Sequence, residues 1–381
     1  PWWPCKNTDR RIQMDGEYYT TIGMDVSDRT TKVCVMAKER GARRIIEETT
    51  IPTTGDALRA YLSGKSSDWP VVFETGTHCR WMKREVESLG MKAIVANPSK
   101  LRMVTESNTK NDRNDARELA RFALADVGLL HPVRLRSERC QQMLRLMKAR
   151  DLLVKVRTMH VNELRGFAKS MGFRLPSCPA NRVHALDKAG WPDDFESLAW
   201  PLMDMLETID LKIRAYEAQI RSLAESGELK DKVGRVREVY GIGLLSGAAL
   251  VASIDADPGR FRKARDAGAY FGLVPRQRQS GEMDAQCHIT RAGSGFVRRL
   301  MIEAAQIAMR ESARDTDVKL KGRRICARGG RIAKKRALVA VARCLVVTAV
   351  ALLKNPDAEY VPLSEPARRE FEAMRSEEAT A

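Results

Sequence analysis

Four acidic residues in the first third of the chain have the type and spacing that phosphoryl-transfer chemistry requires. Asp112 and Asp115 stand three positions apart where a predicted helix begins, and residues at i and i+3 share one face of a helix. Asp25 lies inside a predicted strand and Glu74 ends another. Mg²⁺ prefers carboxylate oxygens and keeps positions open for a substrate phosphate. The four acids therefore predict a Mg²⁺ site, with Mn²⁺ as the alternative ion.

Each acid by itself also has a structural explanation. Asp112 and Asp115 suit the positive end of a helix dipole, and Asp25 and Glu74 are compatible with a turn and a strand end. Together, however, four carboxylates in one cleft would repel one another without cations. Two Mg²⁺ ions would offset this repulsion, activate a water or hydroxyl, and stabilise the leaving oxygen of an in-line attack on a phosphodiester.

The composition indicates a globular protein with a polyanionic partner. Of 381 residues 44% are hydrophobic, and 66 Lys and Arg against 49 Asp and Glu leave a net charge of +17, which predicts two or three domains and nucleic-acid binding. The 8 cysteines are scattered without a C-x-x-C pair, as in a reduced intracellular chain without disulfides or zinc. We see no secretory signal and expect no membrane partner. The apolar run 337–353 contains Arg343 and predicts a buried or partner-facing helix.

The elements that position the acids follow a mixed α/β order. Residues 1–20 show no periodicity and are interpreted as an extension or tag. Three strands then predict a meander, followed by helix, strand, helix, strand and the helix that begins near Asp112. This order is that of the RNase H-like nuclease fold, in which acids from the first strand, a later strand and a closing helix meet at the centre of the sheet.

The middle of the chain is predicted to be helical. Residues 138–167 form a basic amphipathic helix, and 172–191 a loop with Pro and Gly. Apolar residues in 206–223 alternate in steps of three and four, which is typical of a coiled-coil seam. That seam packs either on the earlier helix of the same chain or on another subunit.

Residues 236–250 predict two helices joined by Gly241, Ile242 and Gly243. This is the pattern of a helix-hairpin-helix, whose glycines permit a tight turn and bring backbone N–H groups close to a DNA phosphate. The alternative is an ordinary helix-turn-helix packing unit.

Ser280 is followed by Gly281 and preceded by Arg276 and Arg278. A serine attacks phosphate only if its proton is removed and the phosphate charge is offset. The two arginines would offset the charge, but no base is evident, and His288 is a ligand, a base or a loop residue. The residues alone do not single out Ser280.

A strongly basic span covers residues 319–336 and predicts contacts with nucleic-acid phosphates rather than a solvated loop. The cations assigned to these contacts are Arg323, Arg324, Arg328, Arg331, Lys334 and Lys335. The polar tail 356–381 is expected to be flexible.

Taken together, the motifs resemble the DEDD transposases of insertion sequences described as bridge-RNA-guided recombinases, with the Piv-type DNA invertases as relatives. The resemblance runs from about residue 22 to 353. The motifs that carry it are 23–27, 73–76, 110–116, 241–243, 272–275, 279–281 and 289–293. The departures are the first twenty residues and Ser294, where relatives often have Asn.

The resemblance implies a RuvC-like metal site made by Asp25, Glu74, Asp112 and Asp115, and Ser280 as the nucleophile that joins a DNA 5′ phosphate. It implies donor and target DNA and an element-encoded guide RNA as partners, with Arg291 of the 289–293 motif among the contacts. It also implies a homo-oligomer of four subunits, a dimer of dimers, in which the serine domain of one chain completes the acid site of another. The resemblance further implies that the protein is located in the bacterial cytoplasm and is associated with the nucleoid when bound to DNA.

We therefore expect an extension (1–20), an α/β RuvC-like DEDD domain (21–135), a helical coiled-coil linker (136–230), a mostly α-helical serine-bearing transposase domain with a helix-hairpin-helix-like motif (231–355) and a tail (356–381). The predicted function is RNA-guided DNA recombination through a phosphoserine. The alternatives are a RuvC-type nuclease or Holliday junction resolvase that leaves Ser280 idle, a DNA invertase without guide RNA, and a non-enzymatic nucleic-acid-binding protein.

Overall fold

The computed structural model describes residues 19–39, 41–101, 112–280 and 283–380. The chain divides into two compact units, one up to Leu135 and one from Arg136 onward. The predicted extension 1–20 lies outside the described residues except for its last two positions. The side chains of Asp112 and Ser280 also lie outside what the structure describes.

The first unit contains a five-stranded sheet with the order β3-β2-β1-β4-β5. Its strands are β1 (Thr20–Val26), β2 (Thr30–Glu39), β3 (Ala42–Pro52), β4 (Val71–Glu74) and β5 (Ala93–Ala96). The first three pair antiparallel, β4 is parallel to β1, and β5 is parallel to β4. The predicted meander and the mixed α/β layout are thus confirmed.

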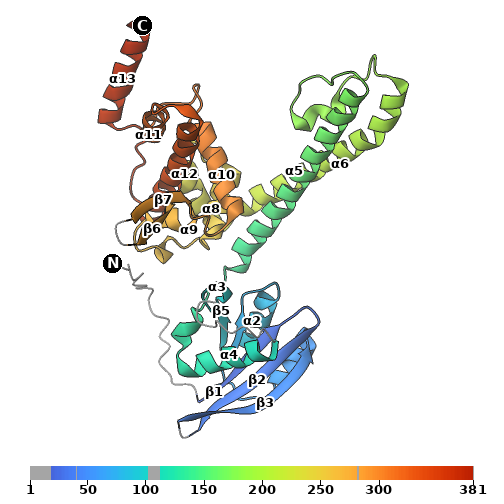
Figure 1. Cartoon of the computed structure of the whole chain (residues 1–381), viewed down its shortest axis with the longest axis vertical. Helices are drawn as coiled ribbons and strands as arrows, with labels where there is room; N and C mark the ends of the chain where they lie inside the picture. Colours follow the sequence, from blue (N-terminus) through green and yellow to red (C-terminus); the bar gives the residue numbers. More distant parts are fainter. Residues whose placement is uncertain (1–18, 40, 102–111, 281–282, 381) are drawn as a thin grey trace. The chain divides into compact units, whose positions relative to one another are not determined.

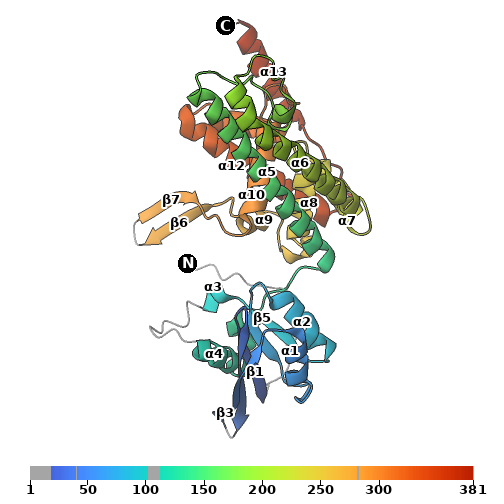
Figure 2. The ribbon, with the colours of Figure 1, turned by 90° about the vertical axis from the view of Figure 1, so that its right-hand side faces the viewer.

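Helices cover both faces of this sheet (Figure 2). Its helices are α1 (Gly55–Leu62), α2 (Cys79–Ser88), α3 (Pro98–Leu101), α4 (Asp112–Ala125) and the 3-10 helix η1 (Val127–Leu130). Met24 and Phe73 are buried with α1 and α2, whereas Val72 is buried with α4. Because side chains alternate along a strand, Asp25 and Glu74 belong to the face that α4 covers.

The second unit begins with a long helical hairpin (Figure 1). It consists of α5 (Glu138–Ser170), the 3-10 helix η2 (Ala180–Ala185) and α6 (Asp193–Ala224). The predicted seam on α6 is buried within the chain, with Leu206 and Ile220 fully covered. The antiparallel hairpin is therefore the alternative that the structure supports.

The rest of this unit is a helical core with one β-ribbon. Its helices are α7 (Leu229–Arg237), α8 (Leu244–Ser253), η3 (Pro258–Arg260), α9 (Asp266–Tyr270), α10 (Gly295–Ala308), α11 (Asp317–Cys326), α12 (Gly330–Lys354) and α13 (Glu365–Thr380). The first turns of α5 contribute Cys140, Met143 and Met147 to the same core, so the hairpin and this core form one unit. Strands β6 (Pro275–Ser280) and β7 (Met283–Ile289) form an antiparallel ribbon that extends from the helices (Figure 2).

Helix α12 is the central helix of this core. In the described part of the chain it is the one helix long and apolar enough to cross a membrane, and half of its most apolar window is buried inside the protein. Val341, Leu345 and Ala349 are fully or almost fully covered by neighbouring elements. The predicted burial of 337–353 is confirmed.

The C-terminal tail differs from the expectation that it is flexible. Residues from Glu365 onward form α13, and Phe371 and Ala367 are buried against Leu320 of α11. The average composition of the tail is polar, but two apolar residues four positions apart lie on one helical face. That small face is enough to dock the helix.

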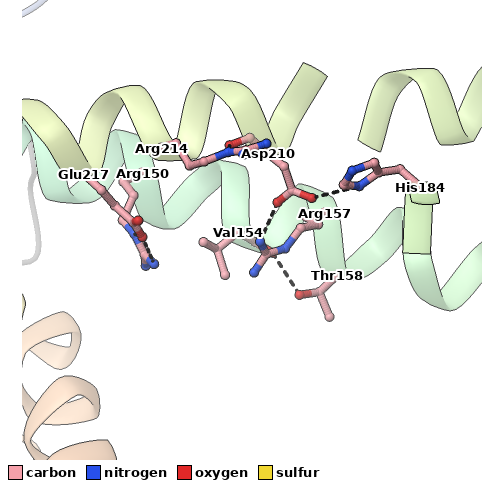
Figure 3. A network of polar contacts seen from close by, with 8 residues as sticks. All are labelled: Arg150, Val154, Arg157, Thr158, His184, Asp210, Arg214 and Glu217. Atoms are coloured by element: carbon pink, nitrogen blue, oxygen red, sulfur yellow. Dashed lines mark hydrogen bonds and ion pairs between the residues drawn. The ribbon is translucent and has the colours of Figure 1, made fainter. Parts of the chain in front are cut away.

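A buried polar network lies within the hairpin (Figure 3). Arg157 of α5 donates to Asp210 of α6 at 2.6 Å, and His184 Nδ1 lies 3.4 Å from the other carboxylate oxygen. The Asp210 side chain is only 5% exposed. Since a buried carboxylate is stable only when paired, this network ties α5, α6 and η2 together.

Replacing Asp210 by Ala is expected to reduce the free energy of unfolding by about 3 kcal/mol, because Arg157 would be left largely buried without its counter-ion. Urea unfolding followed by circular dichroism measures the loss. The matched control is Glu217→Ala, which removes the more exposed partner of Arg150 and should cost less than about 1 kcal/mol. Equal losses in the two variants would contradict this account of the hairpin.

Candidate functional site

Asp25 and Glu74 occupy adjacent positions near the carboxyl-terminal ends of two neighbouring inner strands, β1 and β4. The parallel pairing of β1 with β4 matches Met24 with Phe73, so the next residue on each strand is an acid. Asp25 is half-buried and Glu74 is exposed. The sheet thus brings together two carboxylates that are far apart in sequence, on the face covered by α4.

Helix α4 reaches β1 because residue 23 is glycine. A Cβ at Gly23 would lie 2.1 Å from the carbonyl oxygen of Ala116 and 2.7 Å from the backbone nitrogen of Ala120. These contacts are with backbone atoms, which cannot rotate away as a side chain can. In addition, the Thr21 hydroxyl donates to the carbonyl oxygen of Ala120 at 3.0 Å.

The direction of α4 relative to β1 follows from these contacts. Thr21 lies beside Ala120, and Gly23 lies between Ala120 and Ala116, so the helix and the strand run in opposite directions. Two residues of strand advance about 6.6 Å and four residues of helix about 6 Å. The next equal step places Asp25 level with the first turn of α4, which begins at residue 112.

The two aspartates of α4 lie on different rows of the helix. Ala116 and Ala120 are buried against β2 residues, and Asp112 is one turn before Ala116. Leu119 is buried with Val72 of β4, and Asp115, which is exposed, is four positions before Leu119. The row that contains Ala116 and Ala120 therefore lies over β1 and β2, and the row that contains Asp115 and Leu119 lies over β4.

The chemistry of these donors fits a hard divalent cation. The predicted ligands are all carboxylates near the carboxyl-terminal ends of β1 and β4, where Asp25 is half-buried and Glu74 is exposed. Mg²⁺ and Mn²⁺ take oxygen ligands. Among the described residues no three His, Cys, Asp or Glu side chains are grouped closely enough to hold a metal ion. Asp25, Glu74 and Asp115 are thus not brought together as a three-ligand group, and the side chain of Asp112 lies outside the described residues.

Cys34 is not a competing soft ligand beneath α4. Burial, followed by the nearby Glu48 carboxylate, raises the pKa of its thiol to about 11, although Arg117 acts in the opposite direction. The thiol is therefore protonated at neutral pH. Arg117 instead holds α4 to β3 through a two-pronged ion pair with Glu48, with one N–O distance of 2.6 Å.

His78 and Asp28 form a contact near the acid-bearing strand ends that the sequence did not suggest. Trp81 donates from Nε1 to His78 Nδ1 at 3.1 Å, so His78 Nε2 is the nitrogen that donates to Asp28, at 3.2 Å. This contact links the turn after β1 to the loop after β4. No local pattern could have revealed it, because the two residues are 50 positions apart.

Ser280 ends strand β6 of the ribbon. The register pairs Ser280 with Met283 and Arg278 with Ala285, and the alternation of a strand places positions 276, 278 and 280 on one face. Arg276 is exposed, as is His288 on β7. The side chains of Arg278 and Ser280 and the whole of Gly281 lie outside the described residues, so the association of the two arginines with Ser280 stays a prediction.

The predicted helix pair around Gly241 is α7 and α8. Gly241 has a φ of +97°, and a Cβ there would lie 2.9 Å from the carbonyl oxygen of Ala304 on α10. Gly243 is exposed, precedes the first residue of α8, and has open space around it. Packing on α10 therefore explains Gly241, whereas only Gly243 has backbone that a phosphate can approach.

The predicted basic contacts fall into two groups. Arg291, with a φ of 56°, is exposed, and so are the four cations around the start of α12: Arg328, Arg331, Lys334 and Lys335. On α11, in contrast, Arg324 is paired with Glu370 of α13 through two hydrogen bonds, one of 2.7 Å, and Arg323 lies over the Phe371 ring. The second group already has partners within the chain.

Sequence comparisons connect both units to known proteins. The sequence model of the DEDD transposases of the IS110 type, described as "Transposase", matches residues 22–172. The model described as "Transposase IS116/IS110/IS902 family" matches 233–319. The two matches contain every predicted acid and Ser280.

Individual relatives agree with these matches. The chain is 29% identical over 256 residues to the transposase for insertion sequence element IS1111A of Coxiella burnetii, covering 65% of this chain and 68% of that protein. It is 27% identical to a probable family 20 transposase of Pseudomonas aeruginosa, covering 65% and 74%. For the transposase of insertion sequence element IS1328 of Yersinia enterocolitica the identity is 26%, covering 63% and 70%.

Replacing Gly23 by Ala is expected to lower the unfolding free energy of the first unit by about 2 kcal/mol or more, because the new methyl group collides with the backbone of α4. Thermal unfolding and amide exchange of α4 measure the effect. Gly64→Ala is the control, since its Cβ would meet nothing within 4 Å. A Gly23 variant as stable as the Gly64 variant would show that α4 does not rest on β1 as described.

Proposed function

We propose, from the premise that this chain belongs to the IS116/IS110/IS902 family of transposases, that it cuts and rejoins DNA through a covalent serine link assisted by four metal-binding acids. As a transposase it is an enzyme that acts on DNA. The observation that carries the proposal is the side-by-side placement of Asp25 and Glu74 on the face of the sheet that α4 covers.

The first unit is proposed to be RNase H-like, of the RuvC type. Its strand order and its pattern of antiparallel and parallel pairing support this assignment. Asp25, Glu74, Asp112 and Asp115 would hold Mg²⁺ or Mn²⁺. A bound divalent cation offsets phosphate charge and activates an oxygen nucleophile. Asp25 is half-buried beside a helix packed directly on β1, which would restrict the conformations of this carboxylate.

Ser280 is the proposed nucleophile. Its Oγ would form a bond to phosphorus while the bond from phosphorus to the DNA 3′ oxygen breaks, which leaves a 5′-phosphoserine and a 3′ hydroxyl. The serine proton is transferred to a base and the leaving oxygen gains one, so the reaction needs no energy source and can run backwards to rejoin strands. Arg276 and Arg278 share the face of the ribbon with Ser280 and would offset the phosphate charge.

A guide RNA and an assembly of four copies complete the proposal. The net charge of +17 and the exposed cations around the start of α12 support binding of RNA as well as DNA. Exposed apolar side chains on the hairpin support association with a second copy. Two pairs of them recur at seven-residue spacing, namely Leu152 with Met159 on α5 and Leu198 with Met205 on α6.

A covalent protein–DNA adduct is the expected product when the wild-type chain is incubated with labelled element-end DNA, copurifying RNA and Mg²⁺. Ser280→Ala should abolish the adduct, and Asp25→Asn should reduce its yield at least about a hundredfold by weakening metal binding. Denaturing gel electrophoresis measures the adduct, with Ser88→Ala as the control serine.

Cleavage without an adduct in the wild-type chain would favour the alternative of a RuvC-type nuclease that uses water. Formation of the adduct in the absence of RNA would favour an invertase that needs no guide. DNA binding without cleavage, with every divalent metal ion tested, would favour the alternative of a non-enzymatic nucleic-acid-binding protein.

Glu370→Gln is expected to strengthen nucleic-acid binding, because it releases Arg324 from α13 for a phosphate. One added phosphate contact should steepen the dependence of log affinity on log salt concentration by about 0.9. Fluorescence anisotropy of labelled duplex DNA at several salt concentrations measures the slope.

Glu372→Gln is the matched control, since Glu372 is exposed on the same helix and its loss changes the net charge equally. Adding Arg324→Gln to Glu370→Gln should remove the gain. Identical slopes for the Glu370 and Glu372 variants would show that α13 does not compete with nucleic acid for Arg324.

A further inference from the structure

The ribbon that carries Ser280 extends from a base made by two crossing segments of chain. One segment, 271–274, leads into β6, and the other, 290–294, leads out of β7. They are joined where the Thr290 amide donates to the Val274 carbonyl oxygen at 2.9 Å. The direction of the ribbon is therefore set by how these two segments pack.

Two glycines make this packing a contact of backbone with backbone. A Cβ at Gly272 would lie 2.4 Å from the nitrogen of Ala292, and a Cβ at Gly293 would lie 2.2 Å from the carbonyl oxygen of Tyr270. Both glycines have a φ of +67°, which other residues rarely adopt. Ala292 thus occupies the space in which residue 272 would carry a side chain, and Tyr270, directly before the first segment, occupies that of residue 293.

Arg298 bridges the two segments. Its Nη1 donates to the carbonyl oxygen of Phe271 at 3.0 Å and to that of Ala292 at 2.8 Å. Arg298 is in the first turn of α10, and its side chain is half-buried. The start of that helix is set directly after Gly293, where Ser294 accepts a hydrogen bond from the Val297 amide. The bridge therefore connects the ribbon base to a core helix.

The length of the ribbon makes this base important for chemistry at its end. Ser280 is five residues beyond Pro275, a distance of about 17 Å along an extended strand. A tilt of about 10° at the base would move Ser280 by about 3 Å. A displacement of about 1 Å of a reacting group can reduce the rate about a hundredfold.

We propose that Arg298 is a positioning residue that fixes the direction of the β6–β7 ribbon and thereby aims Ser280 at the DNA phosphate. This inference rests on the proposed function of Ser280. Arg298 acts through the backbone of the ribbon and does not itself touch the DNA. Charge-assisted hydrogen bonds from one guanidinium to both segments hold the base more firmly than a neutral donor would.

The test uses the full chain with Arg298→Met and Arg298→Lys. At saturating DNA the single-turnover rate of adduct formation is expected to fall at least about thirtyfold for Arg298→Met, while the dissociation constant for DNA changes less than about twofold. Arg298→Lys should recover part of the rate, since its ammonium can still donate to the two carbonyls.

The matched control is Arg299→Met. Arg299 is the next residue of α10, but it pairs with Asp151 of α5 and Glu303 rather than with the ribbon base. Its replacement should leave the rate of adduct formation within about twofold of wild type. A loss equal to that of Arg298→Met would mean that any disturbance of α10 has the same effect, and would overturn the positioning role.

Hydrogen exchange without DNA gives a second readout. Arg298→Met should speed exchange of the Thr290 amide about tenfold, while amides in the middle of α12 keep their wild-type rates. Unchanged exchange at Thr290, or faster exchange with an unchanged rate of adduct formation, overturns the inference about Arg298 alone. A wild-type chain that forms no adduct overturns the role of Ser280 and this inference with it. If Arg298→Met does not fold, Arg298→Lys carries the same comparisons.

Discussion

The close contact between α4 and β1 is the constraint on which the first unit depends. At Gly23 the helix backbone lies where any side chain would begin, so the helix has one depth and one register against the sheet. That register places the row of Ala116 and Ala120 over β1 and β2 and the row of Leu119 over β4. The placement of α4 over the face that carries Asp25 and Glu74 is thus a consequence of backbone packing, which side-chain rotation cannot undo.

The second unit uses glycine in the same way at two places. Gly241 lets the turn between α7 and α8 rest on the backbone of α10, and Gly272 and Gly293 interlock at the base of the ribbon. In each case the glycine determines where a neighbouring element comes to rest. Protein interiors are close-packed, so a displacement is not absorbed by voids. Such contacts therefore fix where the neighbouring elements lie.

Some of the positive side chains of the second unit pair with acids of the same chain, and others face solvent. Arg157 and Arg324 are paired with Asp210 and Glu370 and tie helices to one another. The cations around the start of α12, in contrast, are exposed. A count of basic residues predicts binding to a polyanion, but only the contacts show which of them already have a partner within the chain. Arg323 and Arg324 contact α13.

The sequence by itself determined the local structure and which residue types could do chemistry. Alternation of polar and apolar residues predicted the strands, and helical periodicity predicted the helices. The four acids were recognised because each lies within a predicted strand, at its end, or at the start of a predicted helix, namely Asp25, Glu74, Asp112 and Asp115. The sequence left open where the coiled-coil seam packs and what Gly23 is for, and its prediction of a flexible tail was wrong. Only the tertiary structure decided these points, and only it revealed His78 with Asp28 and Arg298 at the ribbon base. The physical reason is that periodicity reports the neighbours of a residue along its own element, whereas these contacts join segments whose separation in sequence carries no local signal.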